Sequence, residues 1–204
     1  MQEKLIIGIS GTANSGKNLF ADILTEILNK KIFLVEQFAL ANKLKQDVAE
    51  ILGIDPKHIY GETKEKIRAT LVHYAKEKRK ATKGRYLTDY LMPRIKNSTA
   101  EIVIITDIRY DDFPKDEVFW LKNELNGVLV HLTKYTITGK GQDIKLVNFP
   151  PANEEEKRND PKLKEQADFC IKWPHSGGAI KILRNKYVVP FCKWLVANKL
   201  LILK

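Results

Sequence analysis

The hydrophobic pattern changes its period within the first 28 residues of the chain. Residues 5–9 form a continuous apolar run rich in β-branched side chains, which is typical of a strand buried on both faces of a parallel sheet. A glycine loop follows at residues 11–17. Apolar residues then recur at helical spacing, at Leu19, Phe20, Ile23, Leu24, Ile27 and Leu28. This stretch therefore predicts a strand, a tight loop and an amphipathic helix.

Short apolar runs alternate with helical periodicity along the rest of the chain. Further strands are predicted at residues 31–35, 101–107, 128–132 and 167–172. Helices are predicted at about residues 39–52, 64–81, 85–96, 115–125 and 180–201. Strands that alternate with helices indicate a parallel sheet with right-handed crossovers. We therefore expect a three-layer α/β fold with about five parallel strands, helices on both faces and the first strand in the centre.

Two segments interrupt this alternation and predict inserts in a single domain. The successive helices of residues 39–97 indicate a helical substrate-binding insert. Residues 135–165 show little periodicity and contain several glycines and prolines, which is typical of a loop or lid over a site. The core of the domain is then formed by residues 1–38, 98–134 and 166–204.

Composition narrows the class of protein. A chain of 204 residues with 44% hydrophobic and 29% charged residues is ordinary for a soluble globular domain. No apolar run approaches the roughly 18 residues that a membrane helix needs. The two cysteines, Cys170 and Cys192, do not make a disulfide framework, and residues 1–4 lead straight into the first strand. We therefore expect no secretory signal, no membrane partner and a reducing, cytoplasmic compartment.

The glycine loop carries the strongest chemical signal. Gly-x-x-x-x-Gly-Lys between a strand and a helix is the phosphate-binding P-loop in its required context. Gly11 and Gly16 allow successive N–H groups to point inward at an anion, and Lys17 adds a cation for the β- and γ-phosphates. The predicted ATP-binding residues are Gly11, Thr12, Ala13, Asn14, Ser15, Gly16, Lys17, Asn18 and Leu19.

A magnesium site is predicted beside this loop. Asn18 stands where the pattern usually has a Ser or Thr that contacts Mg²⁺, and an amide oxygen is a poorer match for that role. Asp107 lies at the carboxyl end of a predicted strand, where α/β sheets bind ligands, and its carboxylate suits a hard cation. We therefore expect Mg²⁺ near Asn18 and Asp107. The four histidines and two cysteines show no metal-binding spacing.

Basic residues outside the loop are candidates for contact with a second anion. Arg109 could bind the acceptor phosphate or the migrating phosphoryl group. The alternative is an ion pair with Asp111, Asp112 or Asp116. Lys64 and Arg68 share one face of a predicted helix and, with Lys43, could clamp an acceptor phosphate or form an ordinary solvated surface. Weaker candidates are Arg79, Tyr74, which could stack on a base, and Arg158 in the predicted lid.

These motifs resemble the deoxynucleoside monophosphate kinases of the phage and large-virus type, within the P-loop kinases. The resemblance is carried by residues 11–17, Phe38 and Ala39 with Lys43, residues 60–68, 104–110, Asp116 and Glu117, and residues 159–161 with 167–168. Members of that family often have Ser-Gly-Lys-Asp where this chain has Ser-Gly-Lys-Asn. The resemblance implies transfer of a phosphoryl group from ATP, with Mg²⁺, to a (deoxy)nucleoside monophosphate. Lys17, Asp107, Arg109 and Arg158 are then the expected catalytic residues.

The net charge of +10 fits an enzyme that brings two polyanions together. Three alternatives remain at this point: another P-loop small-molecule kinase resembling phosphomevalonate or dephospho-coenzyme A kinases, a nucleic-acid binding or end-processing protein, and a nucleotide-binding protein without catalysis. A nucleic-acid partner is disfavoured, because the chain lacks the interleaved aromatic and basic residues of single-strand platforms. The expected partners are small nucleotides, and a homodimer is left open.

Overall fold

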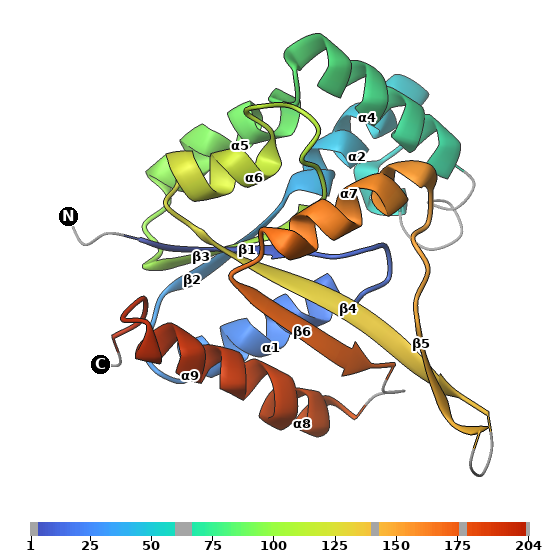
Figure 1. Cartoon of the computed structure of the whole chain (residues 1–204). Helices are drawn as coiled ribbons and strands as arrows, with labels where there is room; N and C mark the ends of the chain where they lie inside the picture. The colour runs from blue at the N-terminus through green and yellow to red at the C-terminus, as the bar shows by residue number, and fades with distance from the viewer. Residues whose placement is uncertain (1–3, 60–66, 140–142, 176–178, 203–204) are drawn as a thin grey trace.

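The computed structural model describes residues 4–59, 67–139, 143–175 and 179–202. In these residues one sheet of six strands has the order β2-β3-β1-β4-β5, and β6 also pairs with β4 (Figure 1). The strands are β1 (Leu5–Ser10), β2 (Val35–Ala39), β3 (Ile102–Ile108), β4 (Val128–Thr138), β5 (Lys145–Asn148) and β6 (Phe169–Pro174). All pairings are parallel except that of β5 with β4. The predicted α/β class and the central position of the first strand are confirmed.

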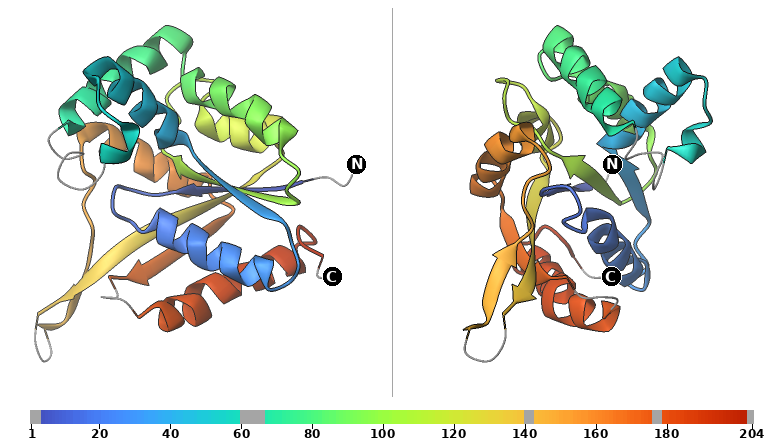
Figure 2. Two further views of the ribbon diagram at one scale, coloured as in Figure 1. Left: turned by 180° about the vertical axis from the view of Figure 1, so that it is seen from behind. Right: turned by 90° about the vertical axis from the view of Figure 1, so that its right-hand side faces the viewer.

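Helices cover both faces of the sheet (Figures 1 and 2). One face carries α1 (Lys17–Asn29), α8 (Ile180–Leu183) and α9 (Val189–Ala197), and a π-helical turn, η4 (Arg184–Val188), joins the last two. The other face carries α2 (Leu40–Leu52), α4 (Arg68–Thr82), α5 (Tyr86–Asn97), α6 (Glu117–Phe119) and α7 (Glu154–Glu165). A 3₁₀ turn, η1 (Pro56–His58), follows α2, and a π-helical turn, η2 (Trp120–Glu124), continues α6. No helix in the described ranges is both long and apolar enough to cross a membrane.

The core is divided by the sheet into two layers. Ile7 and Ile9 of β1 pack in the layer that contains Phe20 of α1 and Phe191 of α9. Ile6 packs in the opposite layer, among residues of α2, α5 and η2. Since successive side chains of a strand point to opposite faces, burial on both sides explains why β1 reads as a continuous apolar run.

The second strand was predicted too early. Residues 31–35 contain only the first residue of β2, because α1 extends to Asn29 and the chain then turns. Ile32 adopts a left-handed φ of 65° in this turn, and its side chain is 80% exposed. β2 instead contains the exposed polar residues Glu36 and Gln37, which an edge strand tolerates and a hydrophobic pattern does not reveal.

The segment 135–165 is more regular than its sequence suggests. β4 continues to Thr138 and pairs with β5 in an antiparallel hairpin that projects from the body of the protein (Figure 1). Helix α7 follows, and the side chain of Asn153 caps it by accepting a hydrogen bond from Glu156 N at 2.8 Å. Leu163 is the one apolar residue of α7 that is buried. The helix therefore has no hydrophobic stripe from which a helical period could be read.

Candidate active site

The glycine loop turns sharply between β1 and α1. Gly11, Asn14 and Gly16 have positive φ angles of 132°, 60° and 90°. A Cβ atom on Gly16 would lie 2.6 Å from Cζ2 of Trp173, whose indole Nε1 donates a hydrogen bond to Ser15 O at 2.8 Å. Both glycines are therefore required by backbone conformation, and Trp173 of β6 supports the loop from behind.

Lys17 begins α1 and is almost completely buried. Its Nζ atom donates hydrogen bonds to the carbonyl oxygens of Gly11 at 2.9 Å and Thr12 at 2.8 Å, and it lies 3.8 Å from Asp107 Oδ1. Burial, with a further contribution from the nearby Arg109, lowers the pKa of Lys17 to about 8. The ammonium group therefore lies at the loop, beside the backbone that would hold phosphate groups.

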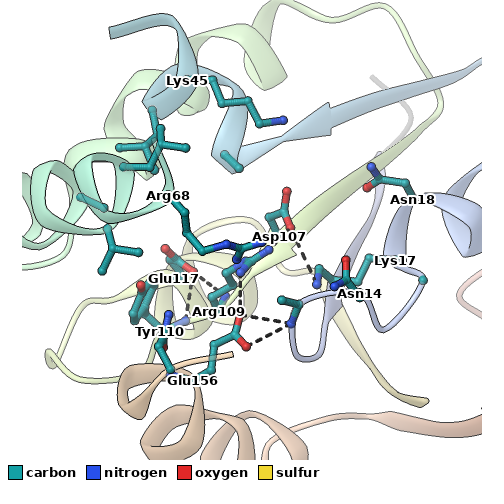
Figure 3. Close-up of a pocket in the computed structure, with 18 of the residues that line it drawn as sticks. Asn14, Lys17, Asn18, Lys45, Arg68, Asp107, Arg109, Tyr110, Glu117 and Glu156 are labelled. Carbon is teal, nitrogen blue, oxygen red and sulfur yellow. Dashed lines mark hydrogen bonds and ion pairs between the residues drawn. The ribbon is translucent and has the colours of Figure 1, made fainter. Parts of the chain in front are cut away.

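Asp107 and Arg109 extend from the carboxyl end of β3, next to the loop (Figure 3). Asp107 has a left-handed φ of 67°, an unfavourable conformation for a non-glycine residue that is characteristic of functional positions. Arg109 donates from Nη2 to Asp107 Oδ1 at 2.9 Å and from Nη1 to Glu156 Oε1 at 2.7 Å. Burial favours the neutral form of Asp107, but Arg109 and Lys17 outweigh it and hold the pKa of Asp107 below its ordinary value.

A cavity of about 720 Å³ lies between the loop, α2, α4 and the segments after β3 and β5. Three acidic side chains line it, those of Asp107, Glu117 and Glu156. The cationic side chains that line it are those of Lys17, Lys45, Arg68, Arg79, Arg109 and Lys134. This excess of positive charge suits one or more polyanionic ligands.

The structure brings most of the predicted site residues together at this cavity. From the loop, Ala13, Asn14, Gly16, Lys17, Asn18 and Leu19 line it, while Gly11, Thr12 and Ser15 form the loop behind them. Arg68, Arg79, Asp107 and Arg109 line its other walls. The predicted alternative partners of Arg109 were Asp111, Asp112 and Asp116, and its guanidinium instead contacts Asp107 and Glu156.

Arg79 lines the cavity, but its charge is engaged within the protein. Its guanidinium contacts Asp116 at 2.6 Å and Glu117 at 3.3 Å, and it stacks 3.6 Å from the centre of the Tyr110 ring. Glu117 in turn accepts hydrogen bonds from the backbone N–H groups of Arg109 and Tyr110. Arg79 therefore supports the segment that carries Arg109, and the substrate contact predicted for it stays a prediction.

Three other predicted residues lie away from the cavity. Lys43 lines a separate hollow of about 150 Å³ and pairs with Asp47. The lysine of α2 that lines the main cavity is Lys45 instead. Tyr74 packs against Tyr86 with ring centres 6.3 Å apart. Arg158 is 54% exposed and pairs with Asp112 at 2.7 Å. Lys64 lies outside the described residues.

Several lining residues were not anticipated. They are Lys45, Tyr110, Glu117, Lys134, Phe149, Asn153, Glu156 and His175. Glu117 belongs to a motif that carried the family resemblance, so the sequence could have indicated it as a site residue. Phe149, Asn153 and Glu156 come from the segment whose sequence shows no period, and only the tertiary structure brings them to the loop.

The donor set at the loop fits a magnesium ion that is shared with phosphates. Asn18 and Asp107 line the same cavity and offer an amide oxygen and a carboxylate. Among the described residues no cluster of three or more His, Cys, Asp or Glu side chains could hold a metal by itself. Mg²⁺ characteristically combines one or two protein oxygens with water and substrate phosphates, so the two residues suffice for such a site.

The fold and the loop define a P-loop kinase of small molecules. Residues 9–125, more than half of the chain, match the family model described as phosphomevalonate kinase, and the chain belongs to this family. A comparison with curated protein sequences finds no match. Membership supports an ATP-dependent phosphotransferase that acts on a small phosphorylated substrate. It favours the alternative of a phosphomevalonate-type kinase over the predicted nucleoside monophosphate kinase.

Proposed function

We propose that this protein transfers the γ-phosphoryl group of ATP to the phosphate group of mevalonate 5-phosphate, forming a diphosphate and ADP. The observation that carries the proposal is that the family match includes the P-loop, Arg68, Asp107 and Arg109, which line one cationic cavity. An acceptor phosphate is already an anion at neutral pH, so an oxygen of it can attack the γ-phosphorus without a strong base. The protein has to align the two phosphates and neutralise the charge between them.

The donor is assigned to the half of the cavity nearest the glycine loop. Lys17 and the loop amides would hold its phosphates, and Mg²⁺ held with Asn18 and Asp107 would supply further charge neutralisation. Beyond the loop, Lys134 donates a hydrogen bond to Asn14 O, and the rings of Phe149 and His175 lie 5.6 Å apart. The flat faces of these two aromatic rings suit stacking on the adenine base.

The acceptor is assigned to the half that α2 and α4 form. Arg68 extends from α4 into the cavity, and Lys45 faces it from α2 (Figure 3). Mevalonate 5-phosphate carries a phosphate and a carboxylate, so two cations at this wall match its charge. Arg109, fixed between Asp107 and Glu156, would contact the phosphoryl group in transfer, because a planar guanidinium suits an oxygen-rich transition state.

A nucleoside monophosphate is a second candidate for the acceptor. The observation that favours it is the apolar part of the cavity wall, formed by Ala41, Leu44, Leu71, Val72, Ala75 and Leu87. The flat face of a nucleobase would cover such a wall, and Tyr110 lines the same cavity.

ADP release with a panel of acceptors tests these assignments. The panel contains mevalonate 5-phosphate, dephospho-coenzyme A and the common ribo- and deoxynucleoside monophosphates. We expect turnover with mevalonate 5-phosphate, and we expect Arg68→Ala to raise the KM of the acceptor at least about tenfold. Lys43→Ala is the matched control and should leave both KM values unchanged. Turnover with nucleoside monophosphates alone would establish the second candidate, and ADP release that no acceptor stimulates would refute both.

A further inference from the structure

Glu156 connects helix α7 to the glycine loop. Its side chain is 7% exposed, and both carboxylate oxygens lie 3.1 Å from the backbone N of Ala13, which donates to them. Oε2 also accepts from Ala152 N at 2.9 Å. Oε1 accepts from Arg109 Nη1 at 2.7 Å (Figure 3). A buried carboxylate requires such donors, and this one uses them to join three separate segments of the chain.

The neighbouring acidic residues of α7 do not share this placement. Glu154 is 87% exposed and faces Lys157 on the surface, and Glu155 accepts a hydrogen bond from the Tyr110 hydroxyl. An acidic residue in the first turn of a helix is common because it offsets the helix dipole. The helix dipole alone does not explain why Glu156 points toward the loop and Glu154 does not. The hydrogen bonds from Ala13 N to Glu156 account for this difference.

Glu156 also completes the restraint of Arg109. Asp107 holds one terminal nitrogen of the guanidinium, and Glu156 holds the other. Glu117 holds the backbone N of Arg109 at 2.7 Å. If Glu156 were removed, the guanidinium would keep only the Asp107 contact and could rotate away from the loop.

We propose that Glu156 is a positioning residue for phosphoryl transfer, which fixes Arg109 beside the glycine loop and couples the docking of α7 to the assembly of the charged site. The inference rests on the proposed function. Glu156 needs no contact with substrate in this role, since it acts through Arg109 and through the Ala13 amide.

Kinetics of Glu156→Gln test the role in catalysis. Glutamine has the same shape but only one acceptor oxygen and no negative charge, so it cannot accept from both Arg109 and Ala152 N, and its hold on the Arg109 guanidinium should weaken. We expect kcat to fall at least about tenfold while the KM for ATP changes less than about threefold. Glu154→Gln, in the same turn of α7, is the matched control and should behave as wild type. A kcat within about twofold of wild type in Glu156→Gln would overturn the inference.

A double-mutant cycle with Arg109→Ala separates positioning from simple packing. If Glu156 acts through Arg109, adding Glu156→Gln to Arg109→Ala should lower kcat by less than about twofold further. Additive losses would show that Glu156 merely anchors α7, and they would overturn the inference.

Arg109→Lys provides a test that leaves Glu156 in place, because a lysine cannot bridge Asp107 and Glu156 in the same way. We expect it to reproduce the fall in kcat.

Hydrogen exchange of the Ala13 amide gives a readout that needs no turnover. In the nucleotide-free protein we expect this amide to be protected, and we expect Glu156→Gln to speed its exchange at least about tenfold. Glu154→Gln should leave it protected. Unchanged exchange in Glu156→Gln would overturn the inference even in an active enzyme. Failure of the wild-type protein to phosphorylate any acceptor would instead refute the proposed function, while the exchange result still decides whether Glu156 holds the loop.

Discussion

Binding of ATP should take up a proton at Lys17. Burial lowers the pKa of this residue to about 8, so about nine-tenths of the protein carries a neutral Lys17 at pH 9 before nucleotide binds. Phosphates placed beside the ammonium group stabilise its charged form and raise its pKa again. Uptake should therefore approach about 0.9 proton at pH 9 and fall to about 0.1 proton at pH 7.

The same linkage sets the pH dependence of affinity. Only the protonated form of Lys17 attracts the phosphates, so the dissociation constant should rise about eightfold between pH 7.5 and pH 9. The phosphates of ATP do not cause this change, because their last ionisation, with a pKa of about 6, is nearly complete at pH 7.5. Calorimetry in two buffers of different ionisation enthalpy measures both quantities directly.

Lys17→Arg is the control for this prediction. Arginine keeps a positive charge but does not titrate below about pH 12, so the proton uptake at position 17 should vanish. Burial also lowers the pKa values of Lys45 and Lys134, which line the same cavity, and any uptake that persists in Lys17→Arg is assigned to them. No proton uptake by the wild type at pH 9, or equal uptake by Lys17→Arg, would refute the reasoning.

Two further predictions concern the support of the site. Arg79→Met leaves Asp116 and Glu117 buried without their cation. We expect this variant to lower the free energy of unfolding, measured by urea titration, by about 3–5 kcal/mol, and a loss below about 1 kcal/mol would contradict the prediction. Trp173→Phe removes the hydrogen bond to Ser15 O, and we expect a loss of about 1–3 kcal/mol together with weaker ATP binding by calorimetry. Wild-type ATP affinity in that variant would show that the loop does not need this support.

An element could be predicted from the sequence where it buries enough apolar side chains to show a hydrophobic pattern. β1 and β3 are covered on both faces, so each contains a continuous apolar run, at residues 5–9 and 102–105, and both strands were identified directly. β2 lies at the edge of the sheet and contains Glu36 and Gln37, and α7 buries little apolar surface. Neither element needs a hydrophobic pattern to form in its place, because pairing with β3 and polar contacts with the 109–112 segment hold them instead.

The sequence does not distinguish Lys43 from Lys45 as the lysine of α2 that faces the cavity. Lys43 and Lys45 lie one residue to either side of Leu44, on opposite edges of the apolar face that Leu40, Leu44 and Val48 define. The helical period therefore places both lysines equally far from the core and cannot say which one faces the ligand. That choice depends on where α4 and α5 lie against α2, which only the tertiary structure determines.

Arg109 shows why the glycine loop alone does not make the site. The three acidic side chains that hold this arginine come from different elements: Asp107 lies in the last two residues of β3, Glu117 begins α6, and Glu156 lies in the first turn of α7. Burial disfavours the charge on Arg109, yet Asp107 and Glu156 together keep its pKa above the ordinary value. Two of these acids lie within eight positions of Arg109 in the chain, whereas Glu156 is 47 positions away. The restraint of this cation beside the loop therefore depends on the docking of α7, an element far from Arg109 in the sequence.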